Sequence, residues 1–235
     1  MEADPLTWSV RREGDSAIVV AFPEYIDPLV NAHCAALACE IRSRRLPWIR
    51  DVVAAYASVT VYIEPLGVDD DTAVEMIRGL ASNTVAIIEE PPPLRLPVCY
   101  GGEYGPDILE VSRYAQCSER DVVRRHSSVT YRVYMLGFLP GFAYLGRVDQ
   151  VIAIPRRNNP RLVVQAGSVG IAGQQTGVYP SQSPGGWQII GRCPIRMIDW
   201  AKKDPFLLGV GGRVRFDPVS EDEYQSLQEL SLIHI

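Results

Sequence analysis

Residues 126–193 decide the fold of this chain: HSSVTYRVYMLGFLPGFAYLGRVDQVIAIPRRNNPRLVVQAGSVGIAGQQTGVYPSQSPGGWQIIGRC. Glycines and prolines recur throughout this stretch and separate short apolar runs. Glycine allows the positive-φ backbone of tight turns, and proline fixes φ while removing a hydrogen-bond donor. This spacing excludes long helices and favours many short strands joined by shaped loops. It predicts a closed or nearly closed β-barrel.

The N-terminal third has a different pattern. The apolar runs LTWSV and SAIVVAF flank Gly14, which suits a hairpin turn. Asp27 and Pro28 then begin a helix that ends among the arginines at 42–45. Residues 51–63 predict one or two strands, and residues 69–80 predict a second helix with acidic residues in its first turn. We therefore expect an α+β domain over residues 1–90.

The run EEPPP at residues 89–93 cannot continue a helix and marks a domain boundary. We expect the second domain to cover residues 91–220, with short helices at 106–115 and 119–126 before the β-rich stretch. Residues 221–235 form a C-terminal tail. Its last six residues, LSLIHI, resemble the translation of a sequencing adapter, so we hypothesise that residues 230–235 replace the natural end.

Composition limits the function classes. The formal net charge of −5 argues against a general nucleic-acid binder, which needs a basic face. The N-terminus has no secretory pattern, and no apolar run reaches the roughly 18 residues of a membrane span. Five scattered cysteines without a CxxC pair are typical of reduced thiols. These features predict a cytoplasmic protein that binds neither nucleic acid nor membrane.

Four strings carry a family resemblance, namely YRVYMLGFLPGFAYLG (131–146), PRRNNPR (155–161), AGSVGIAGQQTGVYP (166–180) and SPGGWQIIGRCP (183–194). Together they resemble the family that contains the B subunit of 5-oxoprolinase, the first subunit of allophanate hydrolase and Kip-type inhibitors of sporulation histidine kinases. The order of elements in the N-terminal third is also similar. The chain departs from the family pattern at Ala143 and Gln165, where prolines are expected, and at Cys193, where threonine is expected.

The resemblance implies a ferredoxin-like N-terminal domain followed by a cyclophilin-like β-barrel domain. It also implies one component of an ATP-dependent 5-oxoprolinase, a lactam hydrolase that converts 5-oxoproline to glutamate and is inactive as a single chain. Proteins similar to the A and C subunits of that enzyme would be the partners, with the C-like chain docking on the barrel.

His126 is the first catalytic candidate. A histidine with a near-neutral pKa can act as a general acid or base, and the segment HSS resembles the corresponding segment of the family. The structural alternative is a histidine at a helix end that bonds a free carbonyl group.

Arg156, Arg157 and Arg161 lie in the string PRRNNPR. Guanidinium groups bind carboxylates in a bidentate manner, and an acidic substrate such as 5-oxoproline supplies one. The alternative is a solvated loop whose arginines form surface ion pairs of little energetic value. We keep both interpretations.

Residues 174–179 are rich in hydrogen-bonding side chains, and we predict that they form one loop. The string SPGGW follows at residues 183–187. Such groups beside glycines suit a pocket for a small polar molecule or a protein interface. The candidate substrate-binding residues here are Gln174, Gln175, Thr176, Tyr179 and Trp187.

No cofactor or metal site is predicted in this chain. The glycines of residues 167–177 do not have the spacing of a dinucleotide fingerprint or a P-loop, and the segment after them cannot be a helix. If the reaction uses ATP, its site lies on a partner protein. Ser168 in AGSVG lacks the first glycine and the helix of a nucleophile elbow.

Two function classes remain open at this stage, because they share a fold. One is a component of an enzyme that acts on 5-oxoproline, or on allophanate or a related urea amide. The other is a Kip-type regulatory protein that binds and inhibits a sensor histidine kinase. Prolyl isomerisation by a cyclophilin-like barrel is a third interpretation, which fold alone does not support.

Overall fold

The computed structural model describes residues 7–24, 26–86, 88 and 90–233. The chain divides into two compact units, Met1–Glu89 and Glu90–Ile235, beside the expected boundary between residues 90 and 91. Within the described residues, no helix combines the length and the apolar character that a membrane span requires.

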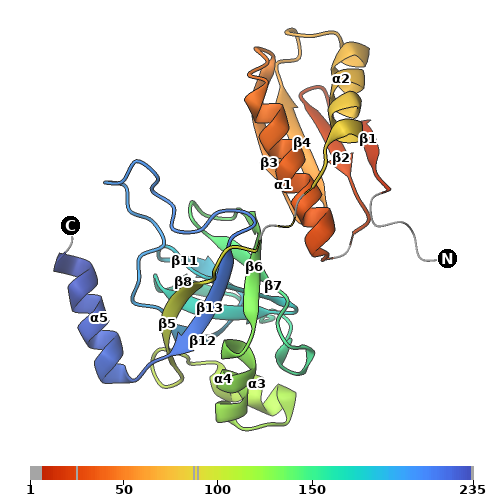
Figure 1. Ribbon diagram of the computed structural model, residues 1–235. Helices are drawn as coiled ribbons and strands as arrows, with labels where there is room; N and C mark the ends of the chain where they lie inside the picture. Colours follow the sequence, from red (N-terminus) through yellow and green to blue (C-terminus); the bar gives the residue numbers. More distant parts are fainter. Residues whose placement is uncertain (1–6, 25, 87, 89, 234–235) are drawn as a thin grey trace. The chain divides into compact units, whose positions relative to one another are not determined.

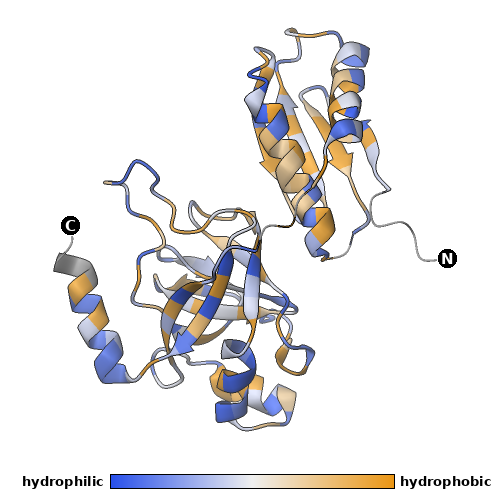
Figure 2. Ribbon diagram, viewed as in Figure 1, coloured by the Kyte–Doolittle hydropathy of each residue, from blue (hydrophilic) through white to orange (hydrophobic). Residues whose placement is uncertain are grey.

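A four-stranded antiparallel sheet forms the base of the N-terminal unit (Figure 1). Its strand order is β1-β2-β4-β3. Gly14, with φ of 66°, makes the turn between the first two strands. Figure 2 shows that apolar residues are frequent on these strands. The strands are β1 (Ser9–Arg12), β2 (Ala17–Ala21), β3 (Ile49–Ala54) and β4 (Ser58–Ile63).

Two helices complete this unit, α1 (Pro28–Ser43) and α2 (Asp70–Asn83). Each begins where the sequence supplies an acceptor for the free amides of the first turn. The carboxylate of Asp27 accepts hydrogen bonds from two amides of α1, and Asp69 accepts one from Thr72. The buried faces of the helices and of the sheet form one apolar core.

The strand order resembles a ferredoxin-like sheet in three of its four positions. Strands β2 and β3 both pair antiparallel with β4, and α1 connects β2 to β3. The fourth position, next to β2, is filled by β1, which precedes β2 in the chain. A ferredoxin-like fold would place there a strand that follows the second helix, so the ferredoxin-like assignment is not established.

The second unit contains a closed seven-stranded barrel, which confirms the expectation of a barrel in this part of the chain. Around the barrel the order is β10-β7-β6-β13-β5-β12-β9. Strand β13 pairs in parallel with β5, and the other neighbouring strands pair antiparallel. The strands are β5 (Leu94–Tyr100), β6 (Thr130–Leu136), β7 (Ala143–Gly146), β9 (Ser168–Ala172), β10 (Gln175–Val178), β12 (Gln188–Arg192) and β13 (Arg213–Pro218).

Short helices lie against the barrel or follow it. Helices α3 (Ile108–Ala115) and α4 (Glu119–Ser127) pack against each other, and a 3₁₀ turn, η1 (Gln150–Ile152), packs against both. Ser118 caps α4, because its hydroxyl oxygen accepts the amide of Asp121. Helix α5 (Glu221–Ile233) occupies the predicted tail. Residues 234 and 235 lie outside the described residues, so the hypothesis about residues 230–235 stays a prediction.

A two-stranded ribbon, β8 (Arg161–Val164) and β11 (Ser183–Gly185), completes the unit (Figure 1). It brings PRRNNPR and SPGGW together, because Gly185 lies opposite Arg161 in the register of the two strands. Two motifs that are more than twenty residues apart therefore meet in space.

Candidate active site

A cluster of aromatic side chains lies beside this ribbon, and we call it the aromatic cluster. The ring centroids of Phe142 and Trp187 are 5.3 Å apart, and those of Phe142 and Tyr179 are also 5.3 Å apart. The interplanar angles of 84° and 76° are those of edge-to-face packing, which aromatic rings favour. The members are Phe138, Phe142, Tyr144, Tyr179 and Trp187.

Two glycines of the barrel strands make room for these rings. A Cβ atom on Gly170 would lie 3.0 Å from Trp187 Cβ, and one on Gly177 would lie 2.8 Å from the carbonyl oxygen of Ala143 and 3.2 Å from the Phe142 ring. A side chain on Gly177 would force the backbone to shift, and one on Gly170 would crowd Trp187. Gly170 and Gly177 of the string AGSVGIAGQQTG therefore allow close packing of the barrel wall against the aromatic cluster.

The segment 155–164, which we call the arginine strap, is held across this region. The amide of Arg157 donates to the carbonyl oxygen of Gly186 at 2.8 Å. At its end the strap becomes strand β8 and pairs with β11. Its backbone is thus fixed at both ends against the segment that carries Trp187.

The side chains of Arg157 and Arg161 both bind the carboxylate of Asp107. Arg161 donates to the two carboxylate oxygens at 2.6 and 2.8 Å, and Arg157 donates to one of them at 2.9 Å. The amide of Ile189 donates to the same carboxylate at 2.6 Å. Only 4% of Asp107 is exposed, so this carboxylate is buried and fully partnered. These two arginines therefore have an internal carboxylate partner.

Arg156 has a different environment. Its guanidinium carbon lies 6.0 Å from the centroid of the Trp187 ring, at the limit of a cation–π contact, and the side chain is exposed. Within the described residues, no carboxylate lies within ion-pair distance of it, whereas Arg157 and Arg161 each have one. Of the three predicted arginines, Arg156 is the one with a guanidinium open to an external anion.

Other polar groups on neighbouring strands also lack partners. The Ser183 hydroxyl of β11 and the amide oxygen of Gln188 on β12 are buried without a hydrogen-bond partner among the described residues. Burial raises the pKa of the Tyr144 phenol, while the charge of Arg156 acts in the opposite direction. Unpartnered buried polar groups are costly unless a ligand, water or another chain satisfies them. In this structure both atoms are shielded from solvent, so a group at the surface does not reach them.

His126, the predicted catalytic residue, lies in the interior of the barrel unit. None of its surface is exposed, and its ring stacks on Phe216 with a centroid distance of 4.7 Å. Burial lowers the pKa of His126 to about 3, so the ring is neutral near pH 7. In this structure a substrate at the surface cannot reach the ring. The position favours the structural interpretation, although the catalytic assignment stays a prediction.

The hydrogen bonds of His126 fix its tautomer. The hydroxyl of Thr176 donates to the carbonyl oxygen of Gly170 at 2.9 Å, so it accepts from Nε2–H of His126 at 2.8 Å. Nδ1 then accepts from the Tyr100 hydroxyl at 2.7 Å. We call this chain of bonds the histidine network. Every ring nitrogen is satisfied inside the protein.

The structure corrects the interpretation of residues 174–179 as one polar loop. Gln175 and Thr176 belong to strand β10, where successive side chains point to opposite faces. Thr176 is fully buried in the histidine network, Gln175 is partly exposed, and Gln174 is exposed. The predicted loop residues are therefore divided between the barrel interior and its surface. Tyr179 and Trp187 belong to the aromatic cluster, next to Arg156.

Asp107 is a site residue that sequence reasoning missed. The string GPD before a helix predicts an ordinary N-cap aspartate. Asp107 does occupy the N-cap position of α3, but its side chain makes no capping hydrogen bond. It binds arginines 50 and 54 residues later in the chain. No local signal distinguishes it from a helix cap.

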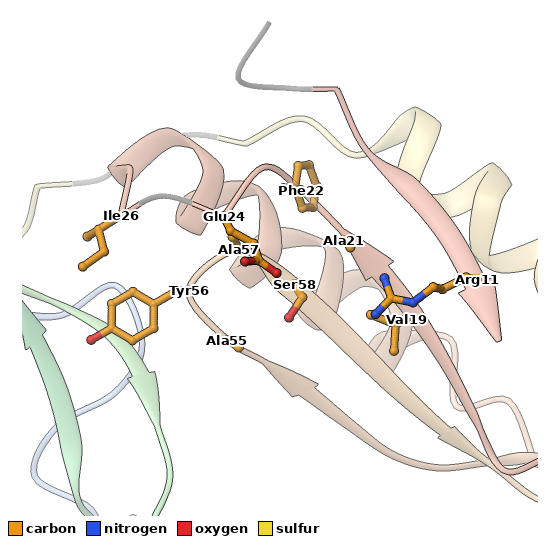
Figure 3. A pocket seen from close by; sticks show the side chains of 10 residues that line it. All are labelled: Arg11, Val19, Ala21, Phe22, Glu24, Ile26, Ala55, Tyr56, Ala57 and Ser58. Atoms are coloured by element: carbon orange, nitrogen blue, oxygen red, sulfur yellow. The ribbon is translucent and has the colours of Figure 1, made fainter. Parts of the chain in front are cut away.

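Further cavities lie elsewhere among the described residues. One of about 370 Å³ belongs to the N-terminal unit, and Figure 3 shows Arg11 at one end of its lining and Ile26 with Tyr56 at the other. None of the predicted site residues lines it. A second, of about 170 Å³, is lined by Tyr179 together with residues of the 193–197 segment and of α5. The described residues contain no group of three metal-binding side chains.

The family described as carboxyltransferase domain, subdomain C and D, matches residues 8–208, and the chain belongs to this family. The resemblance seen in the sequence is also confirmed by curated relatives. The chain is 38% identical to the 5-oxoprolinase B subunit of Bacillus subtilis (strain 168), over 95% of this chain and 98% of that protein. It is 42% identical to the 5-oxoprolinase B subunit of Escherichia coli O157:H7, over 75% of this chain and 81% of that protein.

Solved structures agree on the fold. The crystal structure of TTHA0988 matches 90% of this chain with a TM-score of 0.76 and 32% identity, and the match spans about 40% of the length of that chain. The urea amidolyase of Kluyveromyces lactis matches 97% of this chain with a TM-score of 0.79. Its identity of 19% supports a shared fold alone.

Proposed function

We propose that this chain is the B-type component of an ATP-hydrolysing 5-oxoprolinase, which cleaves 5-oxoproline to glutamate together with A-type and C-type partner chains. The observation that carries the proposal is the match to two proteins named as the B subunit of 5-oxoprolinase, over most of their length. Such a name implies an assembly of several different chains. Arg156, which is exposed and has no ion-pair partner among the described residues, gives that assembly a group for an anionic substrate.

The chemistry of the substrate fits the arginine strap. 5-Oxoproline carries a carboxylate on a small lactam ring. The exposed Arg156 guanidinium can bind that carboxylate through charge-assisted hydrogen bonds. Cleavage breaks the lactam C–N bond, adds the oxygen of water to the carbonyl carbon and leaves the nitrogen as the amine of glutamate.

The remaining machinery belongs to partners in this proposal. The chain has no nucleotide-binding motif, so ATP hydrolysis is assigned to a partner chain, and the single chain is expected to be inactive. The C-like partner would complete the site on the barrel, beside the exposed Arg156. We assign the assembly to the cytoplasm. The ferredoxin-like and cyclophilin-like classifications of the two units belong to the same proposal.

The test is glutamate formation from 5-oxoproline and ATP by the chain co-expressed with its A-like and C-like partners. We expect activity that disappears when this chain is omitted. Arg156→Ala should raise KM for 5-oxoproline by about 10- to 100-fold, the range for loss of charge-assisted hydrogen bonds. The matched control is Arg95→Ala, because Arg95 is an exposed barrel arginine already paired with Asp217.

Activity that persists without this chain, or that is absent from the complete assembly, would contradict the proposal. Binding to a sensor histidine kinase would then be measured, since the Kip-type regulator is the other function class that the sequence leaves open. Allophanate is the alternative substrate to assay in parallel.

A further inference from the structure

Asp107 occupies an unusual position for a helix-capping residue. A carboxylate at an N-cap normally accepts amides of its own helix, but Asp107 makes no such bond. Its acceptor capacity goes to two guanidinium groups and the Ile189 amide. A buried charge needs this full set of partners to be tolerated. The Asp107 side chain therefore holds the arginine strap in place and does not cap helix α3.

The consequence for Arg156 follows from its place in the strap. Arg157, the next residue, is held through its side chain by Asp107 and through its amide by Gly186. Arg161, five residues later, is held by the same carboxylate and leads into strand β8. The backbone that carries Arg156 is thus fixed on its C-terminal side, close to Trp187.

Charge supports the same conclusion. Asp107 neutralises only one of the three arginine charges in the strap, so the region keeps an excess of positive charge while Arg157 and Arg161 are already engaged. A small carboxylate that approaches the strap therefore meets a net positive field, and Arg156 is the guanidinium left to bind it directly.

We propose that Asp107 is a positioning residue for the substrate carboxylate: by binding Arg157 and Arg161 it fixes the strap and holds Arg156 against Trp187. This inference rests on the proposed function for the identity of the carboxylate, 5-oxoproline. Asp107 itself does not touch the substrate. It determines the position of the Arg156 guanidinium.

The experiment compares Asp107→Asn with the wild type in two measurements. The first is hydrogen exchange of the strap amides in the full chain without partners. Loss of the carboxylate charge should accelerate that exchange by about ten-fold or more. The second is steady-state kinetics of the complete assembly. KM for 5-oxoproline should rise by about ten-fold while kcat changes by less than about two-fold, because binding and not chemistry loses a contact.

Two further variants control the comparison. Asp217→Asn removes a carboxylate that binds Arg95 on the barrel, and it should change neither measurement. Asp107→Glu keeps the charge and should return KM towards the wild-type value. If Asp107→Asn does not fold, Arg157→Lys carries the same test, because it removes one guanidinium contact and keeps the charge.

Unchanged strap exchange in Asp107→Asn, or an unchanged KM, would overturn the inference. An assembly of wild-type chains that does not cleave 5-oxoproline would instead overturn the proposed function, and with it the identity of the carboxylate. Strap exchange would still decide whether Asp107 fixes the strap, so the two failures are distinguishable.

Discussion

The histidine network and the arginine strap use polar side chains in opposite ways. In the network, His126, Tyr100 and Thr176 satisfy one another inside the barrel unit, and the chain of donors ends on a backbone carbonyl. In the strap, Asp107 binds Arg157 and Arg161, while Arg156 stays exposed. Residue type does not separate structural from functional groups here. What separates them is whether a rigidly held group still lacks a partner.

The largest expected effect comes from a substitution that removes the central side chain of the histidine network. His126→Ala should lower the free energy of unfolding by about 3–5 kcal/mol, because it leaves a cavity beside Phe216 and unsatisfied hydroxyls on Tyr100 and Thr176. Urea denaturation followed by circular dichroism measures this. Arg124→Ala, at an exposed position of the same helix, is the control and should change it by less than about 0.5 kcal/mol. Equal losses in both variants would contradict the structural role.

The charge state of the network gives a second, smaller effect. His126 has its pKa lowered by burial to about 3 in the folded protein, whereas the unfolded chain protonates near 6.5. Below pH 6.5 the unfolded state therefore binds a proton that the native state excludes. Stability contributed by the neutral ring is present above pH 6.5 and is lost as the pH falls towards 3.

Between pH 6 and pH 4 this loss should amount to about 2–3 kcal/mol, at about 1.4 kcal/mol per pH unit. His126→Phe removes the titrating group, so its urea midpoint should depend less on pH than that of the wild type. Identical pH dependence in the two proteins would show that His126 does not titrate as a buried neutral ring.

The smallest expected effect is a difference in unfolding free energy between variants of two arginines in the strap. Arg161→Ala should destabilise the protein by about 2 kcal/mol, because it removes two hydrogen bonds from the buried Asp107 carboxylate. Arg156→Ala should stay within about 0.5 kcal/mol, since the side chain is exposed. Urea denaturation of both variants checks this. A larger loss from Arg156→Ala would reverse the roles assigned to them.

Local chemistry explains what could be predicted from the sequence. Asp27 begins a helix as the sequence predicted, and the helices predicted at 69–80 and 119–126 also begin near the expected residues, where Asp69 and Ser118 accept first-turn amides. The glycine and proline pattern of residues 126–193 likewise predicted short strands. These signals are complete within a few residues, because a cap or a turn needs only its neighbours.

The site could be predicted only in part, since its organisation is not local. PRRNNPR indicated carboxylate binding, but the sequence did not tell which arginine binds an internal carboxylate, because Asp107 is 50 residues away from Arg157. QQTG looked like a polar loop because a short strand rich in polar residues has the composition of a loop. Only the pairing of β10 with β9 and β7 places Thr176 inside the barrel.

The parallel pairing of β13 with β5 also bears on synthesis of the protein. Val214 lies opposite Leu94, 120 residues earlier in the chain, and β13 also separates β5 from β6. A ribosome must therefore release nearly the whole second unit before the barrel can close. Until then β5 and β6 present free edges on which other chains can pair. Because β13 is synthesised last among the barrel strands, the second unit stays prone to aggregation until β13 pairs with β5 and β6.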